Sequence, residues 1–249
     1  MATCIAITIG LNAVDPAHYS GWSGELRACE FDANDMAAIV KAQGFTVSTL
    51  LTQEATRQAV LGHISDAAEK LQSGDILLLS YSGHGGQLPD LNGDEPDGLD
   101  ETWCLFNGEL VDDELYQSFS QFAAGVRILV FSDSCHSGTI TRDAYYASIR
   151  RGIGEMTGER CLPRELVMTV YQANQNFYDP ILKKREIVKR LEMTKASVLL
   201  ISGCQDNQTS ADGNFNGLFT GVLKEVWNAG KFKGSYRYFH RRIQRRMPP

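Results

Sequence analysis

The chain has 249 residues, of which 43% are hydrophobic, and 30 acidic and 24 basic side chains give it a formal net charge of −6. This length and composition suit one large α/β domain or two small ones, and no Pro/Ser-rich linker divides the chain. Six unclustered cysteines do not form a small disulfide framework, and the sequence shows neither an apolar span of membrane length nor a signal-peptide pattern. We therefore expect a cytoplasmic protein with reduced thiols and no membrane segment.

Apolar runs of strand length alternate with stretches of helical spacing along the first 82 residues. The expected strands are residues 4–10, 46–51 and 75–82, and the expected helices are residues 32–43 and 56–71. Residues 76–79 are apolar without alternation, which is typical of a central strand in a parallel sheet that is covered on both faces.

The same alternation continues in the second half of the chain. Residues 126–131 and 197–202 are expected to form further buried strands, and residues 218–227 are expected to form a closing helix. The order of these elements predicts an α/β sandwich.

Two of the apolar runs end in residues that suit nucleophilic catalysis. His84 follows the run that ends at Ser82, and Cys135 follows the run that ends at Phe131. In an open α/β sheet, ligands bind beyond the carboxyl ends of parallel strands, so these two residues are expected to meet there. An imidazole beside a thiol raises the thiolate fraction and protonates a leaving amine, and the amides of Gly85 and Cys135 are expected to stabilise an oxyanion.

Four ordered motifs extend this pair to a family resemblance. They are Tyr-Ser-Gly-His-Gly-Gly-Gln at 81–87, an acidic Gly-Asp-Glu tract at 93–101, Asp-Ser-Cys-His-Ser-Gly at 133–138 and Gln-Asp-Asn-Gln at 205–208. Over residues 3–229 the chain resembles a bacterial metacaspase-like peptidase, or orthocaspase. The resemblance implies a caspase-like three-layer α/β/α sandwich with a mostly parallel central sheet, a Cys/His dyad, and cleavage after Arg or Lys. We expect a single domain over residues 1–234 and a basic tail over residues 235–249.

The distribution of charge agrees with cationic substrates. Residues up to Cys135 carry 20 acidic and 5 basic side chains, whereas the remainder of the chain is basic. The resemblance implies that Asp32 and Asp133, together with Ser82, line the primary substrate pocket. An alternative for Asp32 is an ordinary acidic residue in the first turn of a helix, where the helix dipole favours it.

The resemblance also raises the question of calcium. No cofactor is expected for the chemistry itself, but carboxylates that match Asp100, Asp112 and Asp113 bind calcium in calcium-dependent metacaspases. A fourth ligand position corresponds to Arg142 here, with Asp143 one residue later, so calcium is left open as an activator. The alternative for Asp112 and Asp113 is the start of a helix.

Residues 142–195 are the least regular part of the chain and are rich in Arg and Lys. A peptidase that cuts after basic residues would meet this tethered segment at high effective concentration, so we expect self-processing there. The alternative is a set of solvated charges on helix faces. The basic tail is expected to dock or to inhibit rather than to bind nucleic acid, because the chain as a whole is acidic.

Three classes of function therefore remain. The first is a cysteine endopeptidase acting on proteins or peptides that contain Arg or Lys, and the second is a catalytically silent caspase-fold module that binds basic peptides in its acidic cleft. The third is a thiol or metal switch that uses Cys135. Membrane and nucleic-acid partners are not expected.

Overall fold

The structure, a computed structural model, describes residues 2–93, 95, 97–134, 158–184, 194–202, 211–212 and 215–247. Its centre is a five-stranded sheet in the order β2-β1-β3-β7-β9, in which every neighbouring pair of strands is parallel. The strands are β1 (Cys4–Gly10), β2 (Thr46–Leu51), β3 (Ile76–Ser82), β7 (Arg127–Asp133) and β9 (Ser197–Ser202). The expected parallel sheet is confirmed, and each of these strands lies close to its predicted position.

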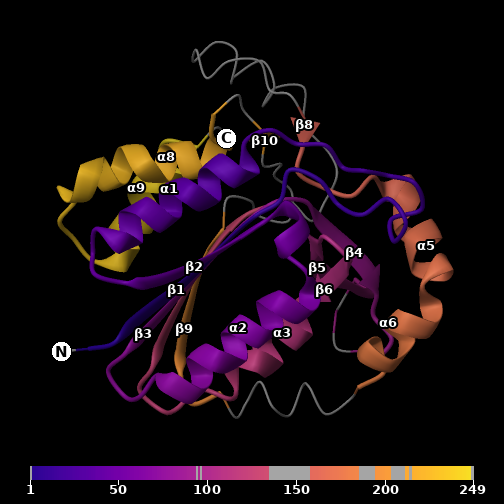
Figure 1. The fold of residues 1–249 in the computed structure, drawn as a ribbon, viewed down its shortest axis with the longest axis horizontal. Helices are drawn as coiled ribbons and strands as arrows, with labels where there is room; N and C mark the ends of the chain where they lie inside the picture. The colour runs from indigo at the N-terminus through magenta and orange to yellow at the C-terminus, as the bar shows by residue number, and fades with distance from the viewer. Residues whose placement is uncertain are drawn as a thin grey trace.

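Helices cover both faces of the sheet (Figure 1). One face carries α1 (Cys29–Lys41), α8 (Leu218–Trp227) and α9 (Tyr236–Gln244), and the other carries α2 (Arg57–Lys70) and α3 (Asp112–Phe119). Leu77 and Leu79 of β3 are buried in the core cluster beneath α2 and α3, whereas Leu78 is buried in the cluster beneath α1 and α8. Successive side chains of a strand point to opposite faces, so a strand buried on both faces must be apolar throughout.

The helix limits follow from their capping groups. The Thr56 hydroxyl accepts a hydrogen bond from the Ala59 amide at 3.2 Å, and α2 begins at the next residue, one position after its predicted start. Helix α1 begins three residues earlier than predicted, because Asn12 accepts the free amides of Cys29 and Glu30 through its Oδ1 atom at 3.0 and 3.3 Å. This cap comes from a residue beyond the end of β1, so the local sequence around α1 could not reveal it.

Several elements were not predicted. An antiparallel sheet contains β4 (Gly85–Pro89), β5 (Leu99–Leu105) and β6 (Gly108–Val111), and a short ribbon pairs β8 (Gly158–Glu159) with β10 (Ala211–Asp212). Helices α5 (Arg164–Ala173) and α6 (Gln175–Leu182) follow β8, and single turns η1 (Thr52–Glu54) and η2 (Asn228–Gly230) complete the described elements. Within the described ranges, no helix has the length and apolar character needed to cross a membrane.

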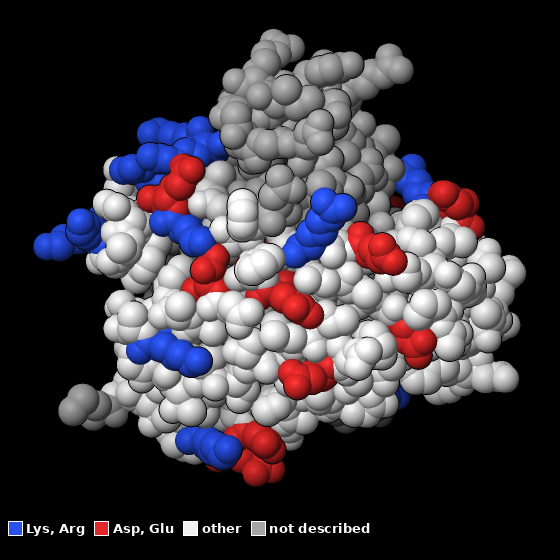
Figure 2. All heavy atoms as spheres, turned by 45° about the horizontal axis from the view of Figure 1, so that its top comes forward, with Lys and Arg blue, Asp and Glu red and all other residues white. Residues whose placement is uncertain are grey.

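The basic tail contains helix α9, which packs on the domain. Phe239 and Ile243 are buried in the same core cluster as Val222 and Leu223 of α8, while the arginines of this helix lie on its other positions. Figure 2 shows one face of the molecule, with Lys and Arg side chains gathered at its upper left. The acidic side chains on this face are scattered and do not form one patch. Residues 236–244 are therefore anchored by their apolar side to the core cluster that α8 shares.

Candidate active site

The ends of β3 and β7 lie side by side at one edge of the sheet. The two strands are parallel and adjacent, and their register pairs Ser82 with Asp133. The chain segments that follow, leading to His84 and to Ser134, therefore leave the sheet at the same edge. Cys135 lies outside the described residues, so its meeting with His84 stays a prediction that this register supports.

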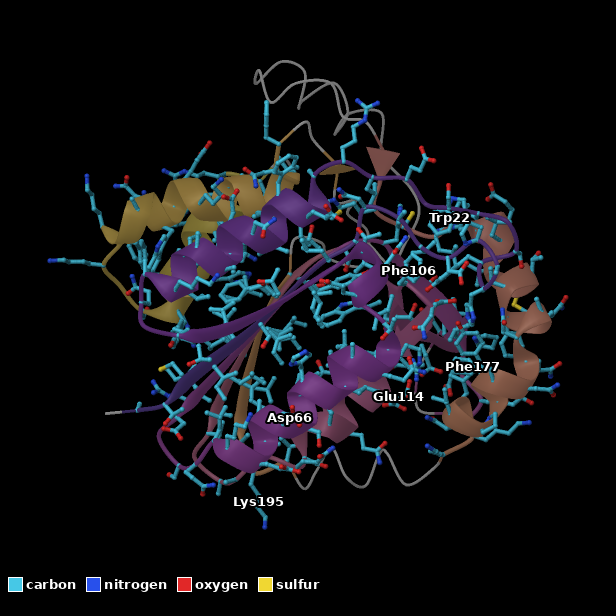
Figure 3. All side chains as sticks on the ribbon, viewed as in Figure 1. Trp22, Asp66, Phe106, Glu114, Phe177 and Lys195 are labelled. Carbon is cyan, nitrogen blue, oxygen red and sulfur yellow. The ribbon has the colours of Figure 1, made fainter. Side chains whose placement is uncertain are left out.

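The imidazole of His84 is held by the loop between β1 and α1. Its Nε2 atom lies 2.9 Å from the carbonyl oxygen of Gly24, and the Trp22 ring packs on it with a centroid separation of 4.6 Å (Trp22 is labelled in Figure 3). A carbonyl oxygen can only accept, so Nε2 carries the proton and the lone pair of the neutral ring lies on Nδ1. His84 is thus fixed in the tautomer whose basic atom is Nδ1, as a general base requires.

A buried carboxyl lies behind the glycines that follow His84. A Cβ atom built on Gly86 would lie 2.5 Å from Oε2 of Glu109 and 2.8 Å from Oγ1 of Thr102, so only glycine lets β4 approach this closely. The Thr102 hydroxyl donates to Glu109 at 2.5 Å. Burial raises the pKa of Glu109 to about 7, and the bond from Thr102 opposes this shift.

This carboxyl predicts a pH-dependent stability. Its folded pKa of about 7 exceeds the ordinary glutamate value of 4.5, so between these values the unfolded state releases a proton that the folded state keeps, and the free energy of unfolding falls as pH rises. The difference corresponds to about 3 kcal/mol in the free energy of unfolding. We expect Glu109→Gln to weaken the fall of the free energy of unfolding between pH 4.5 and 7, as measured by urea unfolding. Glu69→Gln, at an exposed site on α2, should leave this pH dependence unchanged. Equal slopes for Glu109→Gln and the wild type would contradict this.

The residues expected to line the substrate pocket lie together at the same edge. The Ser82 hydroxyl donates to Oδ2 of Asp32 at 2.7 Å, and Asp32, Ser82 and Asp133 are all nearly fully buried. Asp32 lies in the first turn of α1, as the alternative interpretation expected, and it belongs to this cluster as well. The two interpretations of Asp32 are therefore compatible.

The start of α8 is directed at both carboxylates. The amide of Gly217, the N-cap residue, donates to Asp32 Oδ1 at 3.0 Å, and the Asn216 side chain donates to the same oxygen at 2.9 Å. The amide and the hydroxyl of Thr220 donate to Asp133 Oδ2 at 3.0 and 2.8 Å. The free amides and the dipole of a helix N-terminus stabilise negative charge. These donors at the start of α8 stabilise the charges of Asp32 and Asp133 and so allow both carboxylates to be buried in one site.

A cation of the same chain fills the space between these carboxylates. The guanidinium of Arg160 lies 2.8 Å from Asp32 Oδ2 and 3.0 Å from Asp133 Oδ2, and it donates to Ser82 Oγ at 2.7 Å. Arg160 has 0% of its surface exposed. Burial raises the pKa of Asp32, the charge of Arg160 lowers it, and the charge of Asp133 raises it. The expected pocket residues therefore lie together, with an arginine of the protein itself between their carboxylates, and their role in binding substrate stays a prediction.

The backbone of Arg160 is held next to His84. Its carbonyl oxygen accepts a hydrogen bond from the Gly85 amide at 2.9 Å, and the Leu162 amide donates to the Gly85 carbonyl at 2.7 Å. The amide that was expected to stabilise an oxyanion therefore already binds a peptide carbonyl.

The glycine at the start of α8 leaves room for this guanidinium. A Cβ atom on Gly217 would lie 2.4 Å from Nη1 of Arg160, whereas a Cβ atom on Gly221, one turn later, would have its nearest neighbour at 3.8 Å. We expect Gly217→Ala to lower the free energy of unfolding by about 1–3 kcal/mol through overpacking, and Gly221→Ala to raise it by about 0.5–1 kcal/mol. Urea unfolding of both variants checks this. In an Arg160→Ala background the penalty at Gly217 should vanish, and its persistence would show that another contact causes it.

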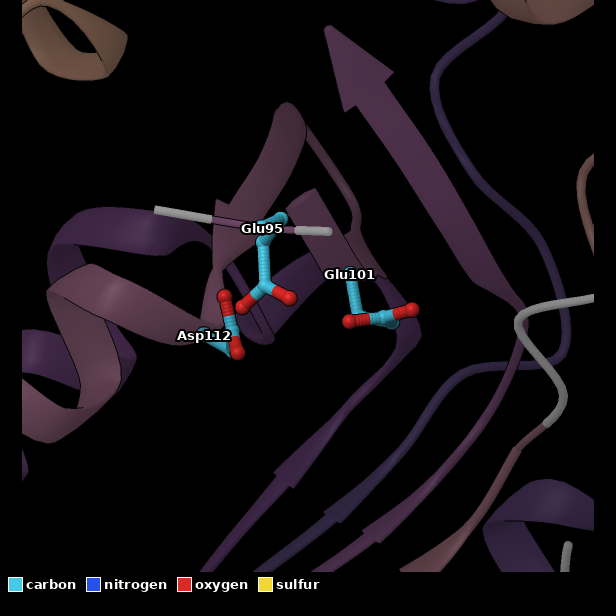
Figure 4. Close-up of side chains that lie close together, drawn as sticks. All are labelled: Glu95, Glu101 and Asp112. Atoms are coloured by element: carbon cyan, nitrogen blue, oxygen red, sulfur yellow. The ribbon is translucent and has the colours of Figure 1, made fainter. Parts of the chain in front are cut away.

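Three carboxylates converge near the start of α3. Oxygen atoms of Glu95, Glu101 and Asp112 lie within 4.8 Å of one another, and Figure 4 shows the side chains pointing together. Burial raises the pKa of Asp112 to about 7, and like charges, including those of Glu101 and Glu95, add to the shift. Oxygen donors of this kind suit calcium.

This carboxylate group shares only Asp112 with the calcium ligands that the resemblance implied. Asp113 accepts a hydrogen bond from the Asn92 side chain at 3.0 Å, and Asp100 is 2% exposed. Arg142 and Asp143 lie outside the described residues. Calcium binding therefore stays a prediction, with Glu95 and Glu101 as further candidate ligands that the sequence analysis did not name.

Other site residues were also missed in the sequence. Trp22 and Gly24 lie in the loop, with two glycines, that directly follows β1, and this position at the carboxyl edge of the sheet was a usable signal. Arg160 was noted only as one of many basic residues, and nothing local distinguishes it. Asn216 and Thr220 flank the start of a predicted helix, where groups that bind anions are expected.

A parallel sheet between two helical layers is the fold of the caspase-like proteins. The fold matches the crystal structure of caspase-1 from Spodoptera frugiperda with a TM-score of 0.59 at 15% identity, over 98% of this chain and 76% of that one. It also matches protein GSU0716 from Geobacter sulfurreducens, with a TM-score of 0.86 at 59% identity, over 99% of this chain and 90% of that one.

The sequence comparisons give the family. The model of the caspase domain matches residues 4–249, so the chain belongs to the caspase-domain family. Metacaspase-1 from Kluyveromyces lactis is 31% identical over 88% of this chain and 56% of its own length, and metacaspase-1 from Coccidioides immitis is 31% identical over 88% and 52%. The likeness to metacaspases is thereby confirmed. The chain spans little more than half the length of these relatives.

Proposed function

We propose that the protein is a cysteine endopeptidase that cleaves peptide bonds after Arg or Lys and that processes its own chain. The observation that carries this proposal is the pair of buried carboxylates, Asp32 and Asp133, with the side chain of Arg160 held between them and its carbonyl bonded to Gly85, the residue after His84. A site that holds one guanidinium in this way suits a cationic substrate side chain, because both carboxylates and the Ser82 hydroxyl accept its donors. Membership of the caspase-domain family and the likeness to metacaspases support the reaction class.

The chemistry divides between three groups. Cys135 supplies the thiolate that attacks the carbonyl carbon of the scissile bond, and His84 takes up the thiol proton at Nδ1. The Gly85 amide donates to the oxygen on which negative charge develops. His84 then protonates the leaving amine, and water hydrolyses the thioester to release the acidic product and the free thiol.

The fixed position of the imidazole supports its assigned role. The Gly24 carbonyl holds Nε2 as a donor and Trp22 covers the ring face, so His84 needs no rearrangement of its tautomer before it acts. A carbonyl partner also stabilises the imidazolium that forms when Nδ1 takes the thiol proton.

Hydrolysis of short peptide amides separates the three function classes. The wild type is expected to hydrolyse amides that end in Arg or Lys, and not those that end in Asp, while Cys135→Ala and His84→Ala are inactive but still fold. Binding of the basic peptide without turnover by the wild type would instead indicate the silent module. Zinc content that changes with redox state would indicate the switch.

Calcium is proposed as an activator that would bind at Asp112, Glu95 and Glu101. Burial is the main cause of the raised pKa of Asp112, and a divalent cation bound there would offset the repulsion between like charges that adds to it. We expect calcium to raise the melting temperature of the Cys135→Ala protein at pH 8 and Asp112→Asn to abolish that rise, with Asp66→Asn on α2 as the control. Identical calcium responses of all three proteins would remove this proposal without affecting the peptidase assignment.

A further inference from the structure

The segment around Arg160 lies in the acidic pocket as a bound peptide would. We propose that the bond between Arg160 and Cys161 is where the chain cuts itself, and that the uncut segment keeps the pocket closed to other substrates. This inference rests on the proposed peptidase function and deepens it by naming the first substrate of the site.

The side chain of Arg160 makes the contacts that a substrate cation needs. Both carboxylates and the hydroxyl of Ser82 accept its donors, and the side chain is completely buried. The guanidinium fills the space between the two carboxylates, and even a single carbon added at Gly217 would lie 2.4 Å from it, so a second cation cannot enter while Arg160 is present. The uncut chain is therefore in a latent state.

The backbone of the segment is bound by strand addition. Residues Gly158 and Glu159 pair antiparallel with Asp212 and Ala211, so the chain that leads to Arg160 is extended and is held by a neighbouring strand. The next residue, Cys161, forms a parallel bridge with Gly85. Peptide ligands commonly bind in this way, with backbone hydrogen bonds that hold the strand and a pocket that selects one side chain.

The carbonyl of Arg160 marks the bond that would be cut. Its oxygen accepts from the Gly85 amide at 2.9 Å, which is the donor assigned to the oxyanion, and Gly85 is adjacent to His84. Arg160 is thus both the residue whose side chain fills the pocket and the residue whose carbonyl binds the oxyanion donor. By contrast, Arg164, four residues later, begins helix α5 and its backbone is not extended.

The step balances as an ordinary acyl transfer. The thiolate of Cys135 forms a bond to the carbonyl carbon of Arg160, the C–N bond to Cys161 breaks, and the proton held by His84 passes to the amine of Cys161. Water then cleaves the thioester, which leaves a carboxylate on Arg160 and returns the thiol. The products are residues 1–160 and 161–249, with no oxidant or cofactor consumed.

The test follows intact mass and peptide hydrolysis in the same samples. Wild-type protein, Cys135→Ala, Arg160→Gln, Arg160→Lys and the control Arg164→Gln are incubated under conditions in which an added arginine peptide amide is hydrolysed. We expect fragments 1–160 and 161–249 from the wild type, Arg160→Lys and Arg164→Gln, and an uncut chain from Cys135→Ala. For Arg160→Gln, cleavage at this bond should fall about 100-fold, because the charge that the carboxylates bind is gone.

Two kinetic measurements distinguish the tethered substrate from cleavage between molecules. The rate constant for the wild-type cut should not change with protein concentration, because the segment already lies in its own pocket. Hydrolysis of the added peptide should show a lag that ends as the cut completes, and Arg160→Gln should hydrolyse it without this lag.

The outcomes separate this inference from the function on which it rests. Hydrolysis of the added peptide by a wild-type chain whose bond after Arg160 stays intact would overturn the inference, leave the peptidase assignment standing, and make Arg160 a permanent ion-pair partner. Absence of hydrolysis of any basic peptide would overturn both. If Arg160→Gln does not fold, the cut in Arg160→Lys and its absence in Cys135→Ala still decide the question.

Discussion

Replacing Arg160 by alanine in a Cys135→Ala background is expected to lower the free energy of unfolding by about 3–5 kcal/mol at neutral pH, because it leaves buried carboxylates without their cation. Asp32 and Asp133 keep their hydrogen bonds from the start of α8, but these do not neutralise two like charges in one buried site. The Cys135→Ala background keeps the chain intact, so the measurement reports the pocket and not a cut. Urea unfolding gives the value.

The pH dependence of this loss is part of the prediction. Arg160 lowers the pKa of Asp32 while burial and Asp133 raise it, so removing Arg160 raises that pKa further. A carboxyl whose folded pKa lies above its unfolded value loses stability as pH rises between the two values. The loss in free energy of unfolding caused by Arg160→Ala should therefore be largest at neutral pH and should become smaller towards pH 4.

A matched arginine provides the control for this experiment. Arg164→Ala removes an exposed cation from the same segment and should change the free energy of unfolding by less than about 0.5 kcal/mol. Equal and small losses for both variants would show that Arg160 does not neutralise the pocket.

Replacing Asp133 by asparagine is expected to reduce the preference for an arginine peptide over its citrulline counterpart by about 10- to 100-fold. Citrulline has nearly the shape of arginine without the charge, and a hydrogen bond to a charged group contributes about 1.5–3 kcal/mol. The measurement is the ratio of kcat/KM for the two peptides on one enzyme preparation. Because it is a ratio, the fraction of active molecules and any effect on the nearby thiol cancel.

Asp35 supplies the matched control. It lies one turn after Asp32 on α1 and binds the Lys224 ammonium and the Asn216 side chain, without contacting the guanidinium. Asp35→Asn should therefore leave the ratio for arginine over citrulline unchanged. An equal fall in both variants would indicate a general effect of negative charge near the cleft, and no fall in Asp133→Asn would contradict its role in the pocket.

Much of the fold followed from local patterns. The continuous apolar runs of β3 and β7 identified them as central strands, because a strand buried on both faces cannot alternate. The helical spacing of residues 56–71 predicted α2 to within one residue at each end. Strand β4 escaped notice, because Gly85 and Gly86 break the usual strand pattern at its start, where Gly86 lies against Glu109.

The sequence by itself determined the caspase-like class and the edge of the sheet at which His84 and Asp133 lie, because ordered motifs follow the apolar runs of β3 and β7; Asp32, on α1, was placed in the same cluster by the family resemblance. Only the tertiary structure decided what occupies the pocket. Arg160 is 128 positions from Asp32 and 27 from Asp133 in the sequence, and no local pattern marks it. A buried cation is placed by the carboxylates that neutralise it, and those come together only when α1, β7 and α8 have packed.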